Sequence, residues 1–277
     1  MHSLKSCSPL SSLGVVAAAL GLVLALSGCG ADFSATPGAK SLREVLRGPS
    51  PADAADMALD PYDPQRRFRG TLLLANAKFA GEPLYMQLFA DGLRDPDPGV
   101  RLASARAIAN HGVPSQAMSL VPLLMDDNQD VRLEAAKGLQ RLHEPKVVDA
   151  LLERLDPKKE PQPEVRAEIA EALGQYAEGR VVQALIAALD DNRLSVNRRA
   201  EASLRTLTGN DLGLDRGAWV RWSQTAGESR TLFAARAAYV HPAYFRSPSW
   251  WEYLPLVQGP KNESAGLPKG FPERFGG

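Results

Sequence analysis

Four segments of the chain repeat one another, and this repetition restricts the possible fold more than any other feature of the sequence. Each segment begins with a valine and has small or apolar residues four and eight positions later, which lie on one face of an α-helix. The valines stand 31, 34 and 31 residues apart; they are Val100, Val131, Val165 and Val196. Because small residues on such a face let helices approach closely, the repeat predicts a row of stacked helices with one shared interior.

A second apolar pair precedes each of these segments. Its two members lie four positions apart, which makes them neighbours on one side of a helix. The pairs are Phe89 and Leu93, Leu120 and Leu124, Leu151 and Leu155, and Leu185 and Leu189. Each repeat is therefore predicted to consist of a helix, a short polar turn and a second helix. Asp97-Pro98 and Gln162-Pro163 have the composition of helix starts, with proline in the first helical position.

A fifth, degenerate unit precedes these four. Ser50 and Asp53 have the spacing of a capped helix start, and Pro64 opens a second helix that runs through three consecutive leucines. Arg66 lies 34 residues before the first repeated valine, so this unit keeps the phase of the repeat. One residue breaks the pattern: Pro122 lies inside a predicted helix, which it should kink or whose start it should displace.

This pattern resembles the HEAT repeat, in the short bacterial form that phycobilisome lyases also have, and the resemblance covers roughly residues 50 to 210. We therefore expect an all-α fold, a HEAT-like α-solenoid of about five helix pairs at residues 41–210, in which neighbouring repeats build one continuous core. Capping helices are expected at residues 211–238. An aromatic and proline-rich tail, disordered from about residue 259 onward, is expected at residues 239–277. The resemblance implies an extended, curved surface suited to binding a partner.

The first 28 residues have the pattern of an export signal. An unbroken apolar run of 14 residues ends at Leu26, whereas a membrane-spanning helix takes about 20. Leu26, Ser27, Gly28 and Cys29 resemble the lipobox of bacterial lipoproteins. The resemblance implies that Cys29 becomes the mature N-terminus and that its thiol and its freed amine carry fatty acyl chains, palmitate among them. The alternative is a plain secretory signal with a chance cysteine.

The residues next to Cys29 indicate a tether and a location. Residues 29–40 are rich in Gly, Ala, Ser, Thr and Pro, which predicts a lipidated, flexible tether. Export and acylation would place the protein in the cell envelope, facing the periplasm or the exterior. Gly30 follows the cysteine where a signal for retention in the inner membrane usually has Asp, so the outer membrane is slightly favoured.

Composition argues against several classes of function. The chain has two cysteines, Cys7 in the signal segment and Cys29, so we expect no free thiol, disulfide or thiolate metal site in the mature protein. The formal net charge is zero, and removing the signal segment with Lys5 leaves it at −1. Binding to nucleic acid requires an excess of Lys and Arg, so no nucleic-acid partner is expected.

The four tryptophans all lie between positions 219 and 251. Trp219 and Trp222 are predicted on a final helix capped by Asp215, where they would cover the open end of the stack. The tail has further aromatic residues, among them Trp250, Trp251 and Tyr253. Since disordered segments usually lack aromatic residues, we expect this part of the tail to pack on the solenoid or, alternatively, on a partner.

No motif for catalysis is found. The three histidines outside the signal segment lack the spacing of a zinc site, and neither a nucleophile elbow nor a phosphate-binding loop is present. We therefore expect no catalytic residue, no metal and no cofactor. Asp126 to Asp130 resembles the first half of a calcium loop, but the sixth-position Gly and the distal Glu are missing, which favours an ordinary turn. His143-Glu144 resembles one dyad of the di-iron site of deoxyhypusine hydroxylase, a HEAT-repeat enzyme; a single dyad favours helix-end chemistry.

Two sets of charged residues follow the repeat. An arginine row is expected to pair with acidic turn residues of neighbouring repeats, with ligand binding as the alternative; it consists of Arg101, Arg132, Arg166 and Arg198. Positions three, six and ten after each valine should face outward on the inner curve of the solenoid. Their charge changes from basic to acidic along the chain, which makes them candidate partner-binding residues unless they are only a solvated face. The candidates on this face are Arg106, Lys137, Arg141, Glu168, Glu171 and Gln175.

Together these features favour a lipid-anchored, non-catalytic interaction scaffold of the bacterial cell envelope, with an unknown envelope protein as its partner. One alternative is a protein that binds an envelope polymer or a small ligand through its aromatic C-terminal segment, including Trp250, Trp251 and Tyr253. The other is a HEAT-repeat enzyme of a lyase or metal-dependent type.

Overall fold

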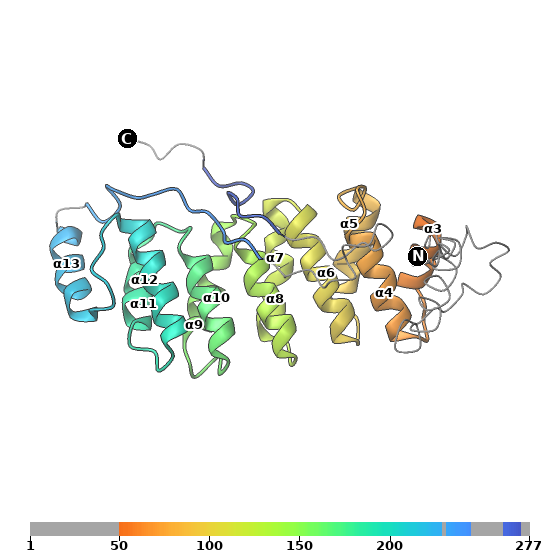
Figure 1. Cartoon of the computed structure of the whole chain (residues 1–277), viewed down its shortest axis with the longest axis horizontal. Helices are drawn as coiled ribbons and strands as arrows, with labels where there is room; N and C mark the ends of the chain where they lie inside the picture. Colours follow the sequence, from red (N-terminus) through yellow and green to blue (C-terminus); the bar gives the residue numbers. More distant parts are fainter. Residues whose placement is uncertain (1–49, 229–230, 245–262, 273–277) are drawn as a thin grey trace, which may run out of the picture. The chain divides into compact units, whose positions relative to one another are not determined.

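Helices make up the regular structure of the chain. The computed structural model describes residues 50–228, 231–244 and 263–272 (Figure 1). Five helix pairs follow one another: α3 (Pro51–Ala58) and α4 (Pro64–Ala75), α5 (Pro83–Gly92) and α6 (Pro98–His111), α7 (Ala117–Leu120) and α8 (Gln129–Leu139), α9 (Val148–Leu155) and α10 (Pro163–Leu173), and α11 (Gly179–Ala188) and α12 (Leu194–Thr208). A last helix, α13, spans Arg216–Glu228. Short 3-10 turns lie at Pro114–Gln116 (η1), Val121–Met125 (η2) and Pro145–Val147 (η3).

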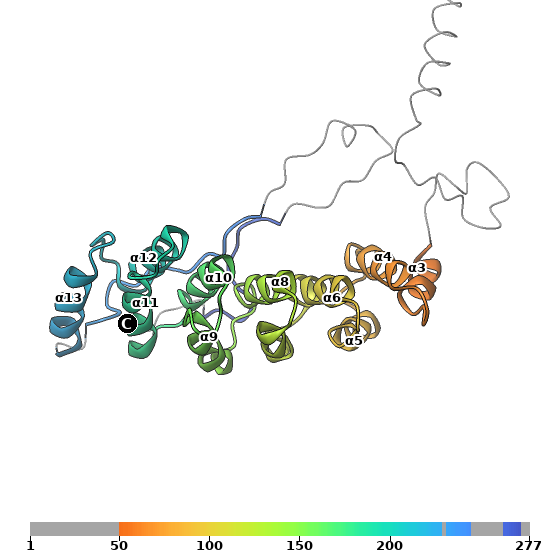
Figure 2. The same ribbon diagram turned by 90° about the horizontal axis from the view of Figure 1, so that it is seen from below.

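These helices form two layers. In Figure 2, α4, α6, α8, α10 and α12, which we call the second helices, make one row, and α5, α9 and α11 make another. Each second helix packs on the next one and also on the first helix of its own pair. The described residues thus form the all-α solenoid of about five helix pairs that the sequence predicts.

The repeated valines lie in the interior. All four are buried. The apolar pairs of the first helices are buried in one continuous core that includes Val131 and Val165. Small residues bring the helices together: a Cβ atom on Gly138 of α8 would lie 2.8 Å from the Leu120 side chain of α7. The shared small-residue interior that the repeat predicts is therefore confirmed.

Most predicted helix starts are also confirmed. Ser50 and Asp53 form a reciprocal capping box, and the side chains of Asp63, Asp97 and Asp215 accept hydrogen bonds from the first turns of their helices. Gln162 occupies the cap position of α10, but its side chain makes no capping hydrogen bond. Helix starts are predictable because they depend on residues close together in sequence.

Pro122 divides the first helix of the third pair. Only four residues form α7, and the chain around Pro122 continues as the 3-10 turn η2. Proline lacks the N–H group that an α-helix needs in its interior and its ring crowds the preceding turn, so the expected disruption is confirmed. Leu120 and Leu124 are nevertheless both buried.

A single helix caps the end of the stack. Trp219 of α13 is fully buried, its indole Nε1–H donates to the Gly213 carbonyl at 2.8 Å, and its ring meets that of Trp222 edge to face. The prediction of several capping helices is wrong, since residues 231–238 are not helical. The chain turns back there, and the Ala237 N–H donates to the Thr206 carbonyl of α12 at 2.8 Å. Within the described residues, no helix is both long and apolar enough to cross a bilayer.

The described parts of the tail pack on the solenoid, and order extends further than predicted. Residues 239–244 and 263–272, which we call the tail segment, run back from the α13 end along the second helices (Figure 1). Isolated β-bridges pair His241 with Gly266 and Tyr244 with Glu263 in antiparallel fashion. The predicted disorder from about residue 259 is wrong for 263–272, because main-chain hydrogen bonds and a buried phenylalanine hold this stretch. Trp250, Trp251 and Tyr253 lie outside the described residues.

Candidate functional site

A ladder of arginine–carboxylate pairs joins consecutive repeats. In each pair the guanidinium donates two hydrogen bonds to the carboxylate of the following turn. Its Nη1 also donates to one or two main-chain carbonyls of its own turn. The pairs are Arg67–Asp95 (2.8 Å), Arg101–Asp126 (2.7 Å), Arg132–Glu160 (2.8 Å) and Arg166–Asp191 (2.8 Å). The expected pairing between repeats is thus confirmed, and Arg67, next to the in-phase Arg66, extends the ladder into the degenerate unit.

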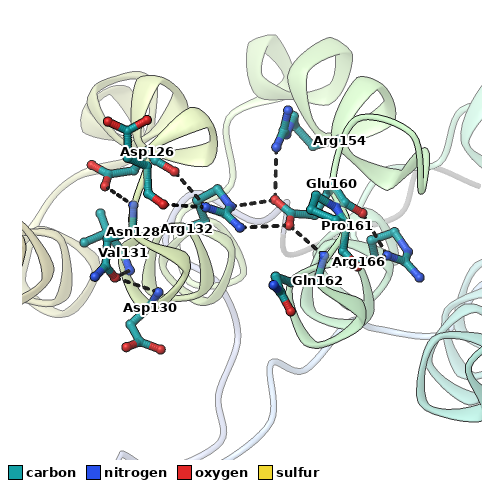
Figure 3. A network of polar contacts seen from close by, with 11 residues as sticks. Asp126, Asn128, Asp130, Val131, Arg132, Arg154, Glu160, Pro161, Gln162 and Arg166 are labelled. Carbon is teal, nitrogen blue, oxygen red and sulfur yellow. Dashed lines mark hydrogen bonds and ion pairs between the residues drawn. The ribbon is translucent and has the colours of Figure 1, made fainter.

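Figure 3 shows the middle of this ladder. The carboxylate of Glu160 is fully buried and accepts hydrogen bonds from Arg132, from Arg154 and from the Gln162 main chain. Its main-chain carbonyl accepts a hydrogen bond from Arg166 at 2.8 Å. Burial pushes the pKa of Glu160 upward, but the hydrogen bonds and charges of the arginines outweigh burial and bring the pKa below its usual value. Glu160 is therefore ionised, and its carboxylate binds arginines from two consecutive repeats.

The ladder ends differently from the expectation. Arg198 is exposed, and the residue that follows the fourth valine is Asn197. The Asn197 side-chain amide donates to the carbonyls of Ala188, Leu189 and Asp191 at 3.1, 2.7 and 3.0 Å. Asparagine holds the turn of its own repeat in this way, but it does not pair with a carboxylate of the next turn as the ladder arginines do. The assignment of Arg198 to the arginine row is therefore wrong.

The stretch that resembles a calcium loop is an ordinary turn. Asp126 accepts hydrogen bonds from Arg101 and from the Asn128 N–H, and Asn128 caps the start of α8. Its polar groups are therefore used within the ladder. Across the described residues, no cluster of three His, Cys, Asp or Glu side chains is arranged to hold a metal ion.

Glu263 of the tail segment lies among cationic and amide groups of the second helices. Arg141 donates to one of its carboxylate oxygens, the Asn110 amide donates to the other at 3.3 Å, and Arg106 Nε lies 3.8 Å away. Burial raises the pKa of Glu263, but the charge and hydrogen bond of Arg141 prevail and lower it below the usual value. This carboxylate therefore binds to the α6–α8 region as an anion.

Tyr244 makes the second anchor of the tail segment. Its hydroxyl lies 2.6 Å from a Glu168 carboxylate oxygen of α10 and 2.9 Å from Gln140 Oε1. The Lys137 ammonium lies over its ring, 4.6 Å from the centroid. Burial and the charge of Glu168 raise the pKa of Tyr244, so the phenol stays protonated and donates to the carboxylate.

Lys269 holds the last part of the tail segment to the ends of two helices. Its ammonium donates to the Asn110 and Gly112 carbonyls at the C-terminus of α6, at 3.0 and 2.9 Å, where cations are favoured. Its main-chain N–H donates to the Arg141 carbonyl at 2.8 Å, and its carbonyl accepts from the His143 N–H at 2.9 Å. These two bonds form a parallel β-bridge between the tail and the residues just after α8.

The His143-Glu144 dyad lies beneath the tail segment. The His143 ring stacks on Tyr176 and meets the edge of Phe271, and its Nδ1 lies 3.0 Å from Gln175 Oε1. Burial lowers the pKa of His143, which makes the neutral imidazole the main form at pH 7. Glu144 accepts a hydrogen bond from the Lys146 N–H at the start of η3. Glu144 thus shows the expected helix-end chemistry, and His143 belongs to an aromatic cluster.

The candidate partner-binding residues of the repeat region, which the structure describes, are all engaged within the chain. Arg141 and Gln175 are buried, with 6% and 0% of their surface exposed, so the expectation that they face outward is wrong. Arg106 pairs with Glu134, which is also buried, and Glu171 pairs with Arg199. Lys137 and Glu168 contact Tyr244. The tail segment therefore occupies the surface that the sequence marks as a partner site.

Sequence reasoning missed several of the residues that make this contact. The aromatic content of the tail predicted packing, but no pattern singled out Glu263, Lys269 or Phe271. An extended segment has no helical period, and these side chains meet groups more than 120 residues earlier in the chain. The only signal in the sequence was that Glu263 is the single acidic residue between Glu252 and Glu273.

An open groove lies at the other end of the stack, with a volume of about 930 Å³ between α3, α4 and α5. At this end α3 packs closely on α4, where a Cβ atom on Gly70 would lie 2.3 Å from the main chain of Ala58. Figure 2 shows α3 beside α4, while α5 lies in the other row. Ala52, Leu84 and Leu88 help line the groove, and Leu84 is 74% exposed. This groove is separate from the face that the tail segment covers.

Comparison with known proteins supports the repeat. Residues 86–160 and 117–205 match the family model for HEAT repeats. Among solved structures, an engineered protein is 19% identical and aligns over 67% of this chain and 98% of its own, with a TM-score of 0.44. A designed armadillo repeat protein is 18% identical and aligns over 65% and 89%, with a TM-score of 0.45. No curated protein matches. The matched residues coincide with helix pairs two to five, so the similarity to HEAT repeats and the helical architecture agree over this part of the chain.

Proposed function

We propose that this protein is a lipid-anchored, non-catalytic scaffold for protein interactions in the bacterial cell envelope. One observation carries the proposal: side chains from three successive second helices together hold an extended polypeptide, which is the chain's own tail segment. Arg106, Lys137 and Glu168 are contributed by α6, α8 and α10 respectively. A face that recognises polypeptide through several repeats is what an interaction scaffold of stacked repeats requires.

The chemistry of this face supports binding over catalysis. Its ionisable groups neutralise one another in pairs, such as Arg106 with Glu134 and Arg199 with Glu171. A catalytic acid or base needs a group whose proton is free to move to a substrate. Paired charges and main-chain donors instead fix the position and orientation of a bound chain.

The proposed anchor rests on the lipobox. Leu26, Ser27 and Gly28 precede Cys29 directly after a short apolar run, the arrangement of lipoprotein signals. Two or more acyl chains hold a protein to a membrane stably, whereas one does so only marginally. Cys29→Ser should abolish incorporation of labelled palmitate and release the protein from the membrane fraction. Unchanged labelling of this variant would overturn the anchor.

The scaffold role is tested by crosslinking in intact cells. A photo-crosslinking residue at Lys137, on the tail-covered face, should give a discrete adduct with one envelope protein. The matched control is the same residue at Glu153, which is exposed on α9 in the other layer. The same adducts from both positions, or no adduct from Lys137 in protein that remains folded, would contradict the proposal.

A further inference from the structure

We propose that residues 263–272, the terminal segment of the tail, are an exchangeable occupant of the second-helix face. The partner they stand in for is an extended peptide with a carboxylate, an amine six positions later and an aromatic ring two positions beyond that. This inference rests on the proposed scaffold function and names the partner class for the same face. Glu263, Lys269 and Phe271 supply the template for this spacing.

The receiving groups belong to the solenoid and define each requirement. Arg141 and Asn110, with Arg106 nearby, receive a carboxylate. The carbonyl groups of Asn110 and Gly112, at the end of α6, receive an ammonium. A different ligand would leave the cationic group of the buried Arg141 without its anion, so the face selects for an acidic residue at this position.

The main-chain contacts of the terminal segment do not depend on its sequence. The Arg141 carbonyl and the His143 N–H pair with the main chain of Lys269 in a β-bridge. Main-chain pairing of this kind supplies affinity in strand addition, while side-chain pockets supply specificity. The aromatic position is a pocket of this sort, because the Phe271 ring lies against His143 and Tyr239. A peptide that carries the acidic, basic and aromatic residues at this spacing can therefore reproduce the whole set of contacts.

The way the terminal segment is attached favours exchange. Buried apolar residues of the helices and their turns make one core cluster, and the terminal segment contributes no member to it. Ser264, Ala265 and Leu267 of the terminal segment are exposed. Its main-chain hydrogen bonds to the solenoid are the two of a single bridge, at Lys269. Removing the segment thus leaves the repeat core covered, and the local opening should cost less free energy than global unfolding.

The first experiment measures exchange directly in the full mature chain, made soluble by Cys29→Ser. The amide protons of Lys269 and His143 form the bridge, whereas amides in the middle of α8 report on the repeat core. The expected result is hydrogen exchange at least about tenfold faster at the two bridge amides than in α8, because opening is local. Equal protection at both places would overturn the proposal, since the segment would then leave only when the solenoid unfolds.

The second experiment uses a labelled synthetic peptide of residues 263–272 as the probe. The triple variant E263A, K269A and F271A weakens the attached segment and leaves the receiving face intact. It should bind the probe at least about tenfold more tightly than the unaltered chain, where the attached copy competes at a local concentration near millimolar. R141A in the triple variant should weaken binding again by about tenfold. Circular dichroism verifies that each variant stays helical; if one does not, the exchange measurement decides.

Specificity separates the possible occupants. A scrambled probe should not bind, and the triple variant should remain monomeric when the probe is bound. Equal binding of the scrambled probe, no binding to a folded triple variant, or a dimer of the unaltered chain held by reciprocal terminal segments would each overturn the proposal. If the probe exchanges but crosslinking at Lys137 captures no envelope protein, the scaffold function fails while the exchangeable site stands.

Discussion

Each carboxylate of the arginine ladder does two things for the fold. Its side chain binds the arginine of the preceding repeat, and its oxygen also accepts the N–H two residues later, which fixes the turn between the two helices of a pair. Asp126 and Glu160 show both contacts. The ladder therefore connects local turn geometry to the stacking of repeats, and a single substitution affects both.

Glu160 gives the sharpest test of this connection. Glu160→Ala leaves Arg132 and Arg154 without their shared anion in a buried position, and breaking a buried pair from one side costs about 3–5 kcal/mol. We expect the free energy of unfolding in urea to fall by about that amount. The control is Glu153→Ala: its ion pair with Lys159 is more than half exposed on both sides and is worth roughly 0–1 kcal/mol. Similar losses for the two variants would show that the ladder contributes no special stability.

Tyr239 tests a different situation, a buried polar group that makes no hydrogen bond and therefore adds little to stability. Its ring is buried, and its hydroxyl has no hydrogen-bond partner among the described residues. Tyr239→Phe should leave the free energy of unfolding unchanged or raise it by about 1 kcal/mol, because an unsatisfied hydroxyl costs free energy when it is buried. Tyr176→Phe is the comparison, since its hydroxyl donates to the Glu144 carbonyl; it should lose about 1 kcal/mol. A loss at Tyr239 equal to that at Tyr176 would be inconsistent with this account.

At the scale of elements, the tail segment should respond to acid. The pKa of Glu263 is lower in the folded chain than in the unfolded one, so its anion stabilises the tail contact fully above the unfolded pKa of about 4.3. That stabilisation is lost as the pH falls through the folded pKa. Amide chemical shifts of Lys269 and Tyr244 should therefore titrate below about pH 4. In Glu263→Gln the same shifts should stay flat, and a full acid transition in that variant would assign the effect to another group.

The elements also show how much the sequence could predict. The helix pairs, their capping residues and the effect of Pro122 were accessible because each depends on periodicity or on residues a few positions apart. The tail segment was not, because it pairs through isolated bridges and meets side chains far away in sequence. Asn197 illustrates an intermediate case. The repeat spacing placed it in the ladder position, but residue type favoured Arg198. The Asn197 amide holds the turn of its own repeat, and no further helix pair follows α12 in the described residues.

The candidate site was likewise predictable only in part from the sequence. The outward positions of the repeats were predicted from the helical period, and four of the six candidates contact the tail segment: Arg106, Lys137, Arg141 and Glu168. Their burial was not predictable from the helical period, because Arg141 contacts Glu263 of the distant tail segment and Gln175 contacts Leu139 and His143 of the preceding repeat. Helical periodicity therefore identifies a surface, whereas its occupant depends on contacts that carry no periodic signal.

At the scale of the whole stack, stability should be nearly a sum over neighbouring repeats, since each repeat contacts mainly the ones beside it. The position of a lesion then determines which helices open. Arg67→Ala removes the first ladder pair, with Asp95, whereas Arg132→Ala removes a middle one, with Glu160. For Arg67→Ala we expect faster hydrogen exchange in α3 and α4, with α10 and α12 unchanged.

Arg132→Ala should instead speed exchange in α8 and α10, on both sides of the broken pair, and broaden the urea transition. The reason is that a weakened interface in the middle divides the stack into two parts that unfold with reduced coupling, while a weakened end only frays. The two variants are matched in residue type and in bidentate geometry, so position is the main difference between them. If both variants accelerate hydrogen exchange uniformly from α4 to α12, the described chain unfolds as one cooperative unit. In that case the tail segment, which contacts residues of α6, α10 and the end of α8, is the element that couples the repeats.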